Sequence, residues 1–474
     1  MSQPTDGTFV AASQHAPVTE GRSRLAIASV LMALALVVLD ASIVNVALPT
    51  LSRSLQVTAA TSVLVVSAYQ AALVMALLPC AALGESLGYR RVFIGGVAVF
   101  TFASGLCAAA PTLSCLVGAR FIQGLGAAAV MALGVSLLRT VVPSHKLGIA
   151  IGWNALVVAL ISAAGPTIGA VLLSLASWPW LFAVNLPVGM LVLGAALALP
   201  EERGSGRPLD WLSTALNMMA FGLLVVGAES LPRAPVLAGL LLVGGALTLI
   251  IMVRREAPKA APLIPLDLLS NRSFSVSVIA SICCFTGQAA GLIALPFYLQ
   301  HTLGLSLLAT GLYITPWPLM AAVAAWLAGR FARPSSTAWL CAVGCACLSA
   351  GLYAACAWPL PGTTAGIVPI IMLCGLGFGL FQVTNNRNMF LSAPLERSGA
   401  AGGLQSVARL TGQTGGVMLA TLLFSAMPLE AAPRICLAMG AILTLTAGLI
   451  SMLHPKAPKS VAPSITRRQK SKGV

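Results

Sequence analysis

Two oppositely charged residues, Asp40 and Arg120, lie inside long apolar stretches of the chain. An ionised side chain is costly in such a setting unless it faces a cavity or a partner, so both are functional candidates. Burial penalises the charged form of a carboxyl group, and we therefore expect Asp40 to exchange protons near neutral pH. Arg120 keeps its charge and needs a partner or water. A transient or water-bridged pair of the two residues would link protonation to conformation.

Other roles stay open for this pair. Asp40 would carry the proton, contact a cationic substrate, or do both in alternation. Otherwise its carboxylate only accepts hydrogen bonds from neighbouring helices, and Arg120 only binds backbone carbonyl groups. We favour proton coupling because Asp40 is the only acid at a comparable depth in the first half of the chain.

A second polar group lies in a later apolar stretch. Gln405 and Gln413 stand four residues on either side of Arg409, so the three side chains share one helix face. Such a face would be expensive in lipid, and we expect it to face the interior, where it contacts substrate or bonds to other helices. The predicted substrate cavity takes polar residues from both halves of the chain: Asn45, Gln70, Gln123, Asn154, Gln288, Tyr298, Gln382, Asn386, Gln405, Arg409 and Gln413.

A charged turn joins two of the apolar stretches and is a candidate gate. It contains Glu85, Gly88, Arg90 and Arg91. We expect Glu85 to pair with a basic residue of a neighbouring helix and so to stabilise the state that is open to the outside. Ordinary anchoring of basic residues on the inner side of a membrane explains Arg90 and Arg91 equally well.

A second candidate for conformational control is the segment with Gly165, Pro166 and Gly169. Proline removes a backbone hydrogen bond and glycine lets another helix approach, so this segment predicts an interrupted, kinked helix in close contact with a neighbour. Glu229 lies about nineteen residues into its own apolar stretch. At 1.5 Å per residue that position is the outer surface, where we expect a solvated side chain.

The composition fits only a membrane protein. The 474 residues are 58% hydrophobic and 8% charged, whereas soluble domains carry about 25% charged residues. The net charge of +15 is also seen in nucleic-acid-binding proteins. Here, however, Lys and Arg lie in short gaps between apolar stretches and form no basic helix face, so we expect no nucleic-acid partner.

The sequence offers no signature of a cofactor or a metal. Its eleven cysteines lie almost entirely within apolar stretches, and no His-rich loop accompanies them. No Walker motif is present, so ATP is not the expected energy source. We therefore expect no metal, no cofactor and no enzymatic activity.

The apolar stretches predict an all-α polytopic membrane protein with fourteen transmembrane helices, because each crossing needs about 20 apolar residues. The predicted spans are Leu25–Leu48, Thr61–Leu83, Val92–Ala110, Leu113–Val142, Leu147–Leu175, Trp178–Leu199, Trp211–Leu231, Pro235–Val253, Phe274–Leu299, Leu305–Leu327, Ala338–Trp358, Ala365–Asn385, Ala401–Ala426 and Ile435–Leu453.

The distribution of basic residues orients these spans. With the N-terminus in the cytoplasm, 22 of the 27 Lys and Arg residues fall on the inner side, three on the outer side and two within spans. This positive-inside bias places both termini in the cytoplasm. We expect a monomeric, multi-pass protein of the bacterial inner membrane, surrounded by the lipid bilayer.

Two long polar gaps divide the spans into a 6+2+6 arrangement, as in transporters built from two six-helix halves. The predicted parts are a disordered cytoplasmic N-terminus (1–24), an N-terminal half (25–199), linkers with two central helices (200–272), a C-terminal half (273–454) and a basic cytoplasmic tail (455–474).

Several short motifs follow one another over roughly residues 25–455: Leu39–Pro49, Gly84–Arg91, Arg120–Ala127, Gly165–Gly169, Ser177–Gly189, Leu295–Gln300 and Ala393–Ala400. In this order they resemble the motifs of the fourteen-span drug:proton antiporters of the major facilitator superfamily. The resemblance implies the major facilitator fold and a proton-linked role for Arg120. The motif that begins at Gly165 is associated with antiporters rather than importers.

The chain departs from the family pattern at five positions. Ala81 and Glu85 stand where the inner-loop motif has Gly and Asp, and Ser86 stands where a basic residue is usual. Ile161 and Ala170 replace two glycines of the fifth-helix motif. These changes would weaken the gating interaction and the close packing that the glycines allow.

The resulting hypothesis is a proton-coupled antiporter that exports small amphiphilic or cationic molecules, such as drugs and toxicants, by alternating access. Its partners would be the small-molecule substrate and protons. A dedicated transporter of a metabolite, such as an amino acid or a siderophore, is a second reading of the same fold. A non-transport membrane receptor is a third, and it predicts no cost when Asp40 is neutralised.

Overall fold

The computed structural model describes residues 20–142, 147–201, 204, 206, 209–232, 234–259, 266–331, 337–358, 366–393 and 398–453. Every regular element in these ranges is a helix. This follows from composition, because a helix satisfies its own backbone hydrogen bonds and can therefore stand in lipid.

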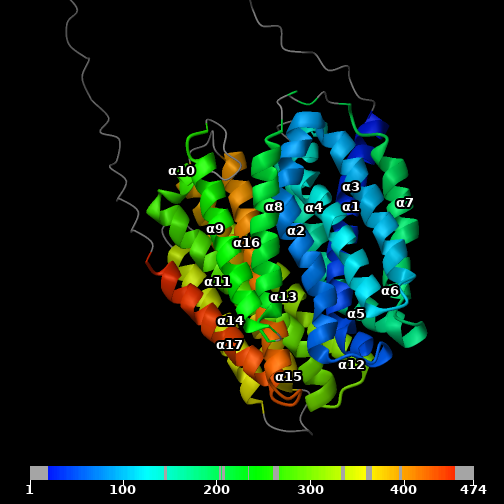
Figure 1. The fold of residues 1–474 in the computed structure, drawn as a ribbon, viewed down its shortest axis with the longest axis vertical. Helices are drawn as coiled ribbons and strands as arrows, with labels where there is room; N and C mark the ends of the chain where they lie inside the picture. The colour runs from blue at the N-terminus through cyan, green and yellow to red at the C-terminus, as the bar shows by residue number, and fades with distance from the viewer. Residues whose placement is uncertain are drawn as a thin grey trace, which may run out of the picture.

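Two helix bundles and a central pair make up the molecule (Figure 1). The N-terminal bundle contains α1 (Glu20–Ser54), α2 (Ala59–Leu87), α3 (Tyr89–Ala108), α4 (Leu113–Val141), α5 (Leu147–Leu175), α6 (Trp180–Ala183) and α7 (Asn185–Ala196). The central elements are α8 (Trp211–Ser230), α9 (Pro235–Glu256) and the short α10 (Leu266–Leu269). The C-terminal bundle contains α11 (Arg272–Phe297), η2 (Tyr298–Thr302), α12 (Leu307–Ile314), α13 (Pro316–Phe331), α14 (Thr337–Ala357), α15 (Ile367–Ser392), α16 (Ser398–Ala426) and α17 (Ala432–Ser451).

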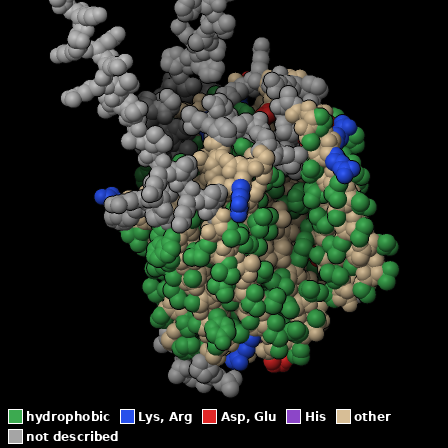
Figure 2. Space-filling view, turned by 90° about the vertical axis from the view of Figure 1, so that its left-hand side faces the viewer, with side chains coloured by type: hydrophobic (Ala, Val, Ile, Leu, Met, Phe, Trp, Pro, Cys, Tyr) green, Lys and Arg blue, Asp and Glu red, His purple; other side chains and the backbone are tan. Residues whose placement is uncertain are grey.

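Eleven helical segments among the described residues are long and apolar enough to cross a membrane. Two shorter apolar helices, Leu160–Leu175 and Trp180–Ala196, accompany them. Charged side chains lie toward the two ends of the face in Figure 2, and hydrophobic side chains cover the band between them. The chain is therefore a multi-pass membrane protein. The number of crossings, fourteen, stays a prediction.

The two bundles meet mainly through α2 and α5 of the N-terminal bundle, with a smaller contact between α1 and α11. Helix α2 packs against α16, and α5 packs against α12 and α13. Near the end that carries α12, one core cluster of buried residues includes members of both bundles, among them Leu48 on α1 and Leu299 in η2. The interface between the bundles therefore involves α1, α2 and α5 on one side.

Helix α5 runs without interruption through Pro166, so the predicted break in this helix is wrong. The predicted close contact is present. A Cβ atom on Gly165 would lie 2.4 Å from the Cβ atom of Ser42, and one on Gly169 would lie 3.2 Å from Ile43. The glycines thus let α5 press against α1 just beyond Asp40.

Ala170 replaces a glycine of the fifth-helix motif, and a glycine on the neighbouring helix compensates for it. Ala170 is fully buried, and α12 places Gly311 opposite it. A Cβ atom on Gly311 would stand 2.5 Å from the Cβ atom of Ala170. The space that a glycine at position 170 would provide is therefore supplied by Gly311.

Candidate functional site

The centre of the candidate site is a carboxylate that lies entirely inside the N-terminal bundle. Asp40, on α1, has no exposed surface, and Arg120, on α4, is 1% exposed. The two residues form an ion pair with 2.5 Å between Nη1 of Arg120 and Oδ2 of Asp40. Two charges at this depth need such a partner, since an isolated one would be very costly.

Two amides complete the shell of the carboxylate. Gln123 Nε2 donates to Asp40 Oδ1 at 3.0 Å, and Asn185 Nδ2 donates to the same oxygen at 2.8 Å. Gln123 also joins the two charges, because its Oε1 accepts from Arg120 at 2.6 Å. Ser104 Oγ accepts from Gln123 at 2.8 Å and from Asn185 at 3.4 Å. We call Asp40, Arg120, Gln123, Asn185 and Ser104 the carboxylate network.

Residues of α2 and α6 contact the Arg120 guanidinium group on the sides that do not face Asp40. Arg120 Nε donates to the carbonyl oxygen of Val65 at 3.2 Å. The Arg120 Cζ atom lies 4.1 Å from the centre of the Tyr69 ring and 5.7 Å from that of Phe182. These cation–π contacts stabilise the charge without a second acid.

Three donors converge on the two carboxylate oxygens of Asp40, and the guanidinium of Arg120 is a permanent cation. The ion pair therefore joins α1 to α4 inside the bundle.

The structure changes the membership predicted from sequence. It brings Asp40 and Arg120 into direct contact. Gln123, predicted as a residue of the substrate cavity, is fully buried in the carboxylate network. Asn185 and Ser104 were not predicted as site residues. The only signal for Asn185 was its motif near the start of the sixth span, because a contact over 145 positions leaves no periodic trace.

The polar face of α16 is the second part of the site. Gln405, Arg409 and Gln413 are all partly exposed, and they lie on one face of α16 as predicted. Arg409 is enclosed by the bundle, and no described charged side chain stands near enough to offset its burial. Within the described part of the chain its guanidinium makes no hydrogen bond and no ion pair.

Other predicted cavity residues have free polar atoms. The side-chain oxygens of Asn45, Gln70 and Gln288 are buried without a hydrogen-bond partner among the described residues. Gln382 and Asn386 are partly exposed on α15. Such unsatisfied groups are expected where a bound molecule or water supplies the missing partner.

Of two further predicted cavity residues, one is fully buried and the other has a side chain outside the described residues. Tyr298 is fully buried in the core cluster that joins the bundles, and the guanidinium of Arg434 lies 5.8 Å from its ring centre. Its role as a cavity-lining residue stays a prediction. Asn154 lies on α5, but its side chain is outside the described residues.

The charged turn between α2 and α3 is held by an ion pair of Arg90, and the predicted pairing of Glu85 with a basic residue of a neighbouring helix stays a prediction. Gly88 joins the helices with φ 101°, a conformation that favours glycine. Arg90 pairs with Glu201 at 2.9 Å and donates to the carbonyl oxygen of Leu197 at 3.1 Å. Glu85 and Arg91 are exposed. The described contacts of Arg90 tie this turn to the end of α7.

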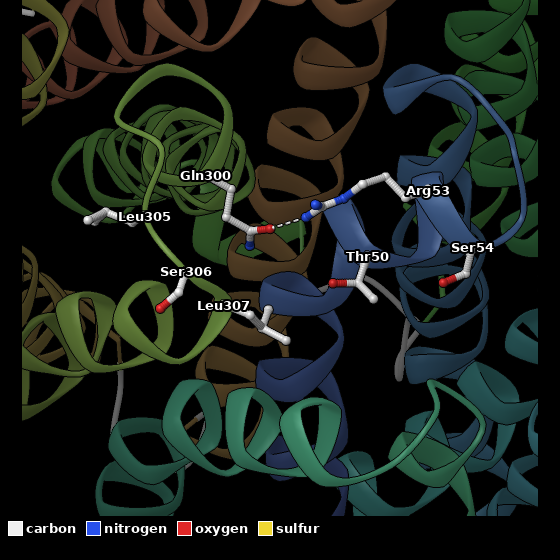
Figure 3. Close-up of a pocket in the computed structure, with 7 residues that line it drawn as sticks. All are labelled: Thr50, Arg53, Ser54, Gln300, Leu305, Ser306 and Leu307. Carbon is white, nitrogen blue, oxygen red and sulfur yellow. Dashed lines mark hydrogen bonds between the residues drawn. The ribbon is translucent and has the colours of Figure 1, made fainter. Parts of the chain in front are cut away.

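A cavity of about 400 Å³ lies at the other end of the bundle interface (Figure 3). Arg53 of α1 and Gln300 of η2 point toward one another across it, with 2.7 Å between Nη2 and Oε1. Nearby, the hydroxyls of Thr167 on α5 and Thr315 at the end of α12 are 2.5 Å apart. These polar contacts join the two bundles at this end, and neither was predicted from sequence.

The central pair is anchored to the N-terminal bundle through an acid. Glu229 of α8 accepts a hydrogen bond from Ser67 Oγ of α2 and is partly buried, so the expectation of a solvated side chain is wrong. Ser67 stands between Val65 and Tyr69, the two α2 residues that hold Arg120. The contact therefore connects α8 to the helix that supports the carboxylate network.

A charged cluster fixes the other ends of α8 and α9. Asp210 caps α8 by accepting from the backbone N–H of Ser213 at 3.0 Å, and it pairs with Lys259 and Arg255. The hydrogen bond from Lys259, followed by that from Ser213, holds the pKa of Asp210 well below its usual range. Partial burial opposes the charge of Lys259, but its hydrogen bonds to Asp210 and Glu256 raise its pKa.

Comparison with known proteins identifies the family of the chain. The model of the Major Facilitator Superfamily matches residues 30–417. The "Uncharacterized transporter YebQ" of Escherichia coli (strain K12) is 39% identical over 445 residues, which are 92% of this chain and 96% of that protein. The "Tetracenomycin C resistance and export protein" of Streptomyces glaucescens is 29% identical over 430 residues, 87% of this chain and 78% of that protein.

Solved structures show the same fold. A crystal structure of peptide transporter POT in complex with sulfate superposes with a TM-score of 0.67 at 16% identity, covering 90% of this chain and 93% of that one. At this identity the likeness concerns the fold alone.

Proposed function

The chain belongs to the Major Facilitator Superfamily and is a membrane transporter rather than an enzyme, and from that premise we propose that it is a proton-coupled antiporter that exports small amphiphilic molecules. We further propose fourteen crossings, with both termini in the cytoplasm and the protein in the inner membrane. Export proceeds by alternating access, in which the two bundles expose the interior first to one side and then to the other.

The observation that carries the proposal is the fully buried carboxylate network. Asp40 has a single cationic partner, Arg120, and two neutral donors, Gln123 and Asn185. When α1 and α4 separate, Asp40 loses the guanidinium and takes up a proton. When they close again, Arg120 returns and displaces the proton.

The helices that meet at the bundle interface couple this step to access. Helix α1 carries Asp40, the α5 contact at Ser42, and Arg53 at the interface cavity. A rearrangement of α1 therefore acts on the carboxylate network and on the contacts between the bundles together. Movement of one elementary charge through 100 mV supplies about 2.3 kcal/mol, which supports a gradient of roughly 50-fold per proton.

The direction of transport is supported by two independent features. The segment from Gly165 to Gly169 resembles the family motif that is associated with antiporters. The Streptomyces glaucescens relative is described as a resistance and export protein. The interior has few charges beside large apolar surfaces, which suits amphiphilic molecules.

The decisive experiment compares two carboxylate variants in a bacterial host that lacks its own drug pumps. Wild type, Asp40→Asn and Glu430→Gln are expressed at equal levels and challenged with a panel of amphiphilic toxicants. Glu430 is exposed in the turn just before α17, so its variant controls for the loss of one negative charge. We expect resistance from wild type and Glu430→Gln, and none from Asp40→Asn.

Proton movement is measured in everted membrane vesicles. Addition of an exported compound should release protons from energised wild-type vesicles and not from Asp40→Asn vesicles. Full resistance in Asp40→Asn would rule out the proton-carrier role.

A dedicated metabolite transporter is the second candidate. It is favoured by the polar atoms without partners on Asn45, Gln70 and Gln288, since narrow specificity needs several fixed polar contacts. This reading predicts no resistance to any compound in the toxicant panel, together with proton release on addition of one class of metabolite.

A further inference from the structure

We propose that Arg409 is the binding site for an acidic group of the transported molecule, so that the substrates are amphiphilic anions or zwitterions with a carboxylate, sulfonate or phosphate. This inference rests on the proposed transport function and narrows its substrate class. The chemistry is charge-assisted hydrogen bonding from a planar guanidinium, which matches two oxygens of one acid group.

The first support is that Arg409 has no hydrogen-bond or ion-pair partner in the described part of the chain. It is enclosed by the helices, yet its side chain keeps partial access to solvent. No described side chain or carbonyl group accepts a hydrogen bond from it. An enclosed cation without a partner lowers stability, so an anion that binds there removes an existing cost.

The second support is the contrast with Arg120. Both arginines are enclosed within helix bundles, but Arg120 has Asp40, the Val65 carbonyl, Gln123 and the Tyr69 ring around it. Arg409 has none of these kinds of contact among the described residues. Of these two arginines, Arg120 is satisfied, whereas Arg409 is free to bind as far as the described residues are concerned.

The third support is the electrostatic state of the interior. Asp40 is the acid that a cationic substrate would need, and it has no exposed surface and three internal donors. The accessible charge in the interior is therefore positive. This geometry favours an anionic group on the substrate over a cationic one.

The position of Arg409 in the fold suits a substrate site. Helix α16 packs against α2 of the N-terminal bundle and against α11 of its own bundle. The next residue, Leu410, is buried in the core cluster that contains Tyr69. Arg409 thus lies on a helix of the C-terminal bundle that also contacts the N-terminal bundle. Alternating access would therefore change its surroundings.

The energetics of such a substrate agree with export. A monoanion that leaves a cell with a negative interior moves down the membrane potential, and so does a proton that enters. Both movements draw on the same electrical gradient. The bundle-facing amides Gln405 and Gln413, on the same helix face, supply donors beside the guanidinium.

The test is equilibrium binding to the purified full-length protein in lipid nanodiscs. The probes are aromatic sulfonates, carboxylates and phosphates, each paired with a neutral amide of the same ring system, together with aromatic ammonium ions. The proteins are wild type, Arg409→Gln, Arg409→Lys and Arg330→Gln. Arg330, exposed at the end of α13, controls for the loss of one positive charge.

We expect at least one anion to bind wild type and Arg330→Gln more tightly than its neutral pair. Affinity for it should fall about 10- to 100-fold in Arg409→Gln and recover in part in Arg409→Lys. The proposal is overturned if no anion is preferred to its neutral pair, if ammonium ions bind best, or if Arg409→Gln binds the anion as wild type does.

Thermal unfolding without probe gives a second readout. Because Arg409 has no partner, Arg409→Gln should be at least as stable as wild type, whereas a structural arginine would destabilise the protein when replaced. Binding needs no proton gradient, so failure of proton-coupled export and failure of anion binding are separate results. An Asp40→Asn protein that does not transport should still prefer the anion.

Discussion

At the scale of single residues, the two interior arginines of this transporter have opposite surroundings. Arg120 is bound on all sides, and its strongest partner is Asp40 at 2.5 Å. Arg409 is enclosed without a partner among the described residues. The sequence predicts both arginines within membrane spans, but only the fold distinguishes the paired arginine from the one without a described partner.

The buried ion pair makes a prediction about stability. Asp40→Asn leaves Arg120 buried with an uncompensated charge, and we expect a loss of about 3–5 kcal/mol. The double variant Asp40→Asn with Arg120→Gln removes both charges and should recover most of that loss. Thermal unfolding of the purified proteins measures the effect.

Transport separates this structural role from coupling. The double variant should be well folded but unable to move protons, because no carboxylate remains at position 40. Equal stability of Asp40→Asn and the double variant would show that the two side chains do not interact as the structure places them.

At the scale of helices, the contact between α1 and α5 lies directly beside the carboxylate network. Gly165 abuts Ser42, two residues beyond Asp40. The motif indicated close packing, and the structure adds the partner. Nothing in the sequence named α1, because the residues that meet are over a hundred positions apart.

This contact predicts different outcomes for two equivalent substitutions. Gly165→Ala places a Cβ atom 2.4 Å from Ser42 Cβ, whereas Gly118→Ala, on α4, meets nothing within 4 Å. We expect Gly165→Ala to cost about 1–3 kcal/mol, and Gly118→Ala to leave stability unchanged or raise it by up to about 1 kcal/mol. Thermal unfolding and transport assays measure both.

A compensating change tests the assignment. Ser42→Gly removes the atom that Gly165→Ala would strike, so the double variant should recover stability and transport. If Gly165→Ala behaves as Gly118→Ala does, α1 and α5 are not packed as described.

At the scale of the whole molecule, the central helices are tied to the N-terminal bundle. Glu229 of α8 contacts Ser67 of α2, and Asn217 Nδ2 of α8 donates to the Met75 carbonyl at 2.8 Å. Helix α8 therefore packs beside the helix that supports Arg120. The pair is an integral part of the fold rather than a loose insertion.

The proposed topology predicts the behaviour of reporter fusions. With fourteen crossings and a cytoplasmic N-terminus, green fluorescent protein at the C-terminus should fluoresce, and alkaline phosphatase there should be inactive. After Leu231, at the end of α8, the two reporters should show the opposite pattern. Active phosphatase at the C-terminus would mean an odd number of crossings.

The sequence by itself determined the class of protein, the approximate positions of most long apolar helices and the two charged residues that meet in the N-terminal bundle. Charge depletion leaves lipid as the only suitable solvent, and apolar length marks each helix. An acid and an arginine at matching depths each gain stability from an opposite charge, so their positions predict that they meet. These are local or compositional properties, so a single sequence contains them.

Tertiary structure decided which distant residues meet. It placed Asn185 on Asp40, Ser42 against Gly165, Glu229 on Ser67 and Gln300 on Arg53. It also showed that Arg409 has no described partner. Such contacts depend on the rotation and depth of each helix in the bundle, which are fixed by packing among helices and leave no mark in the spacing of residues.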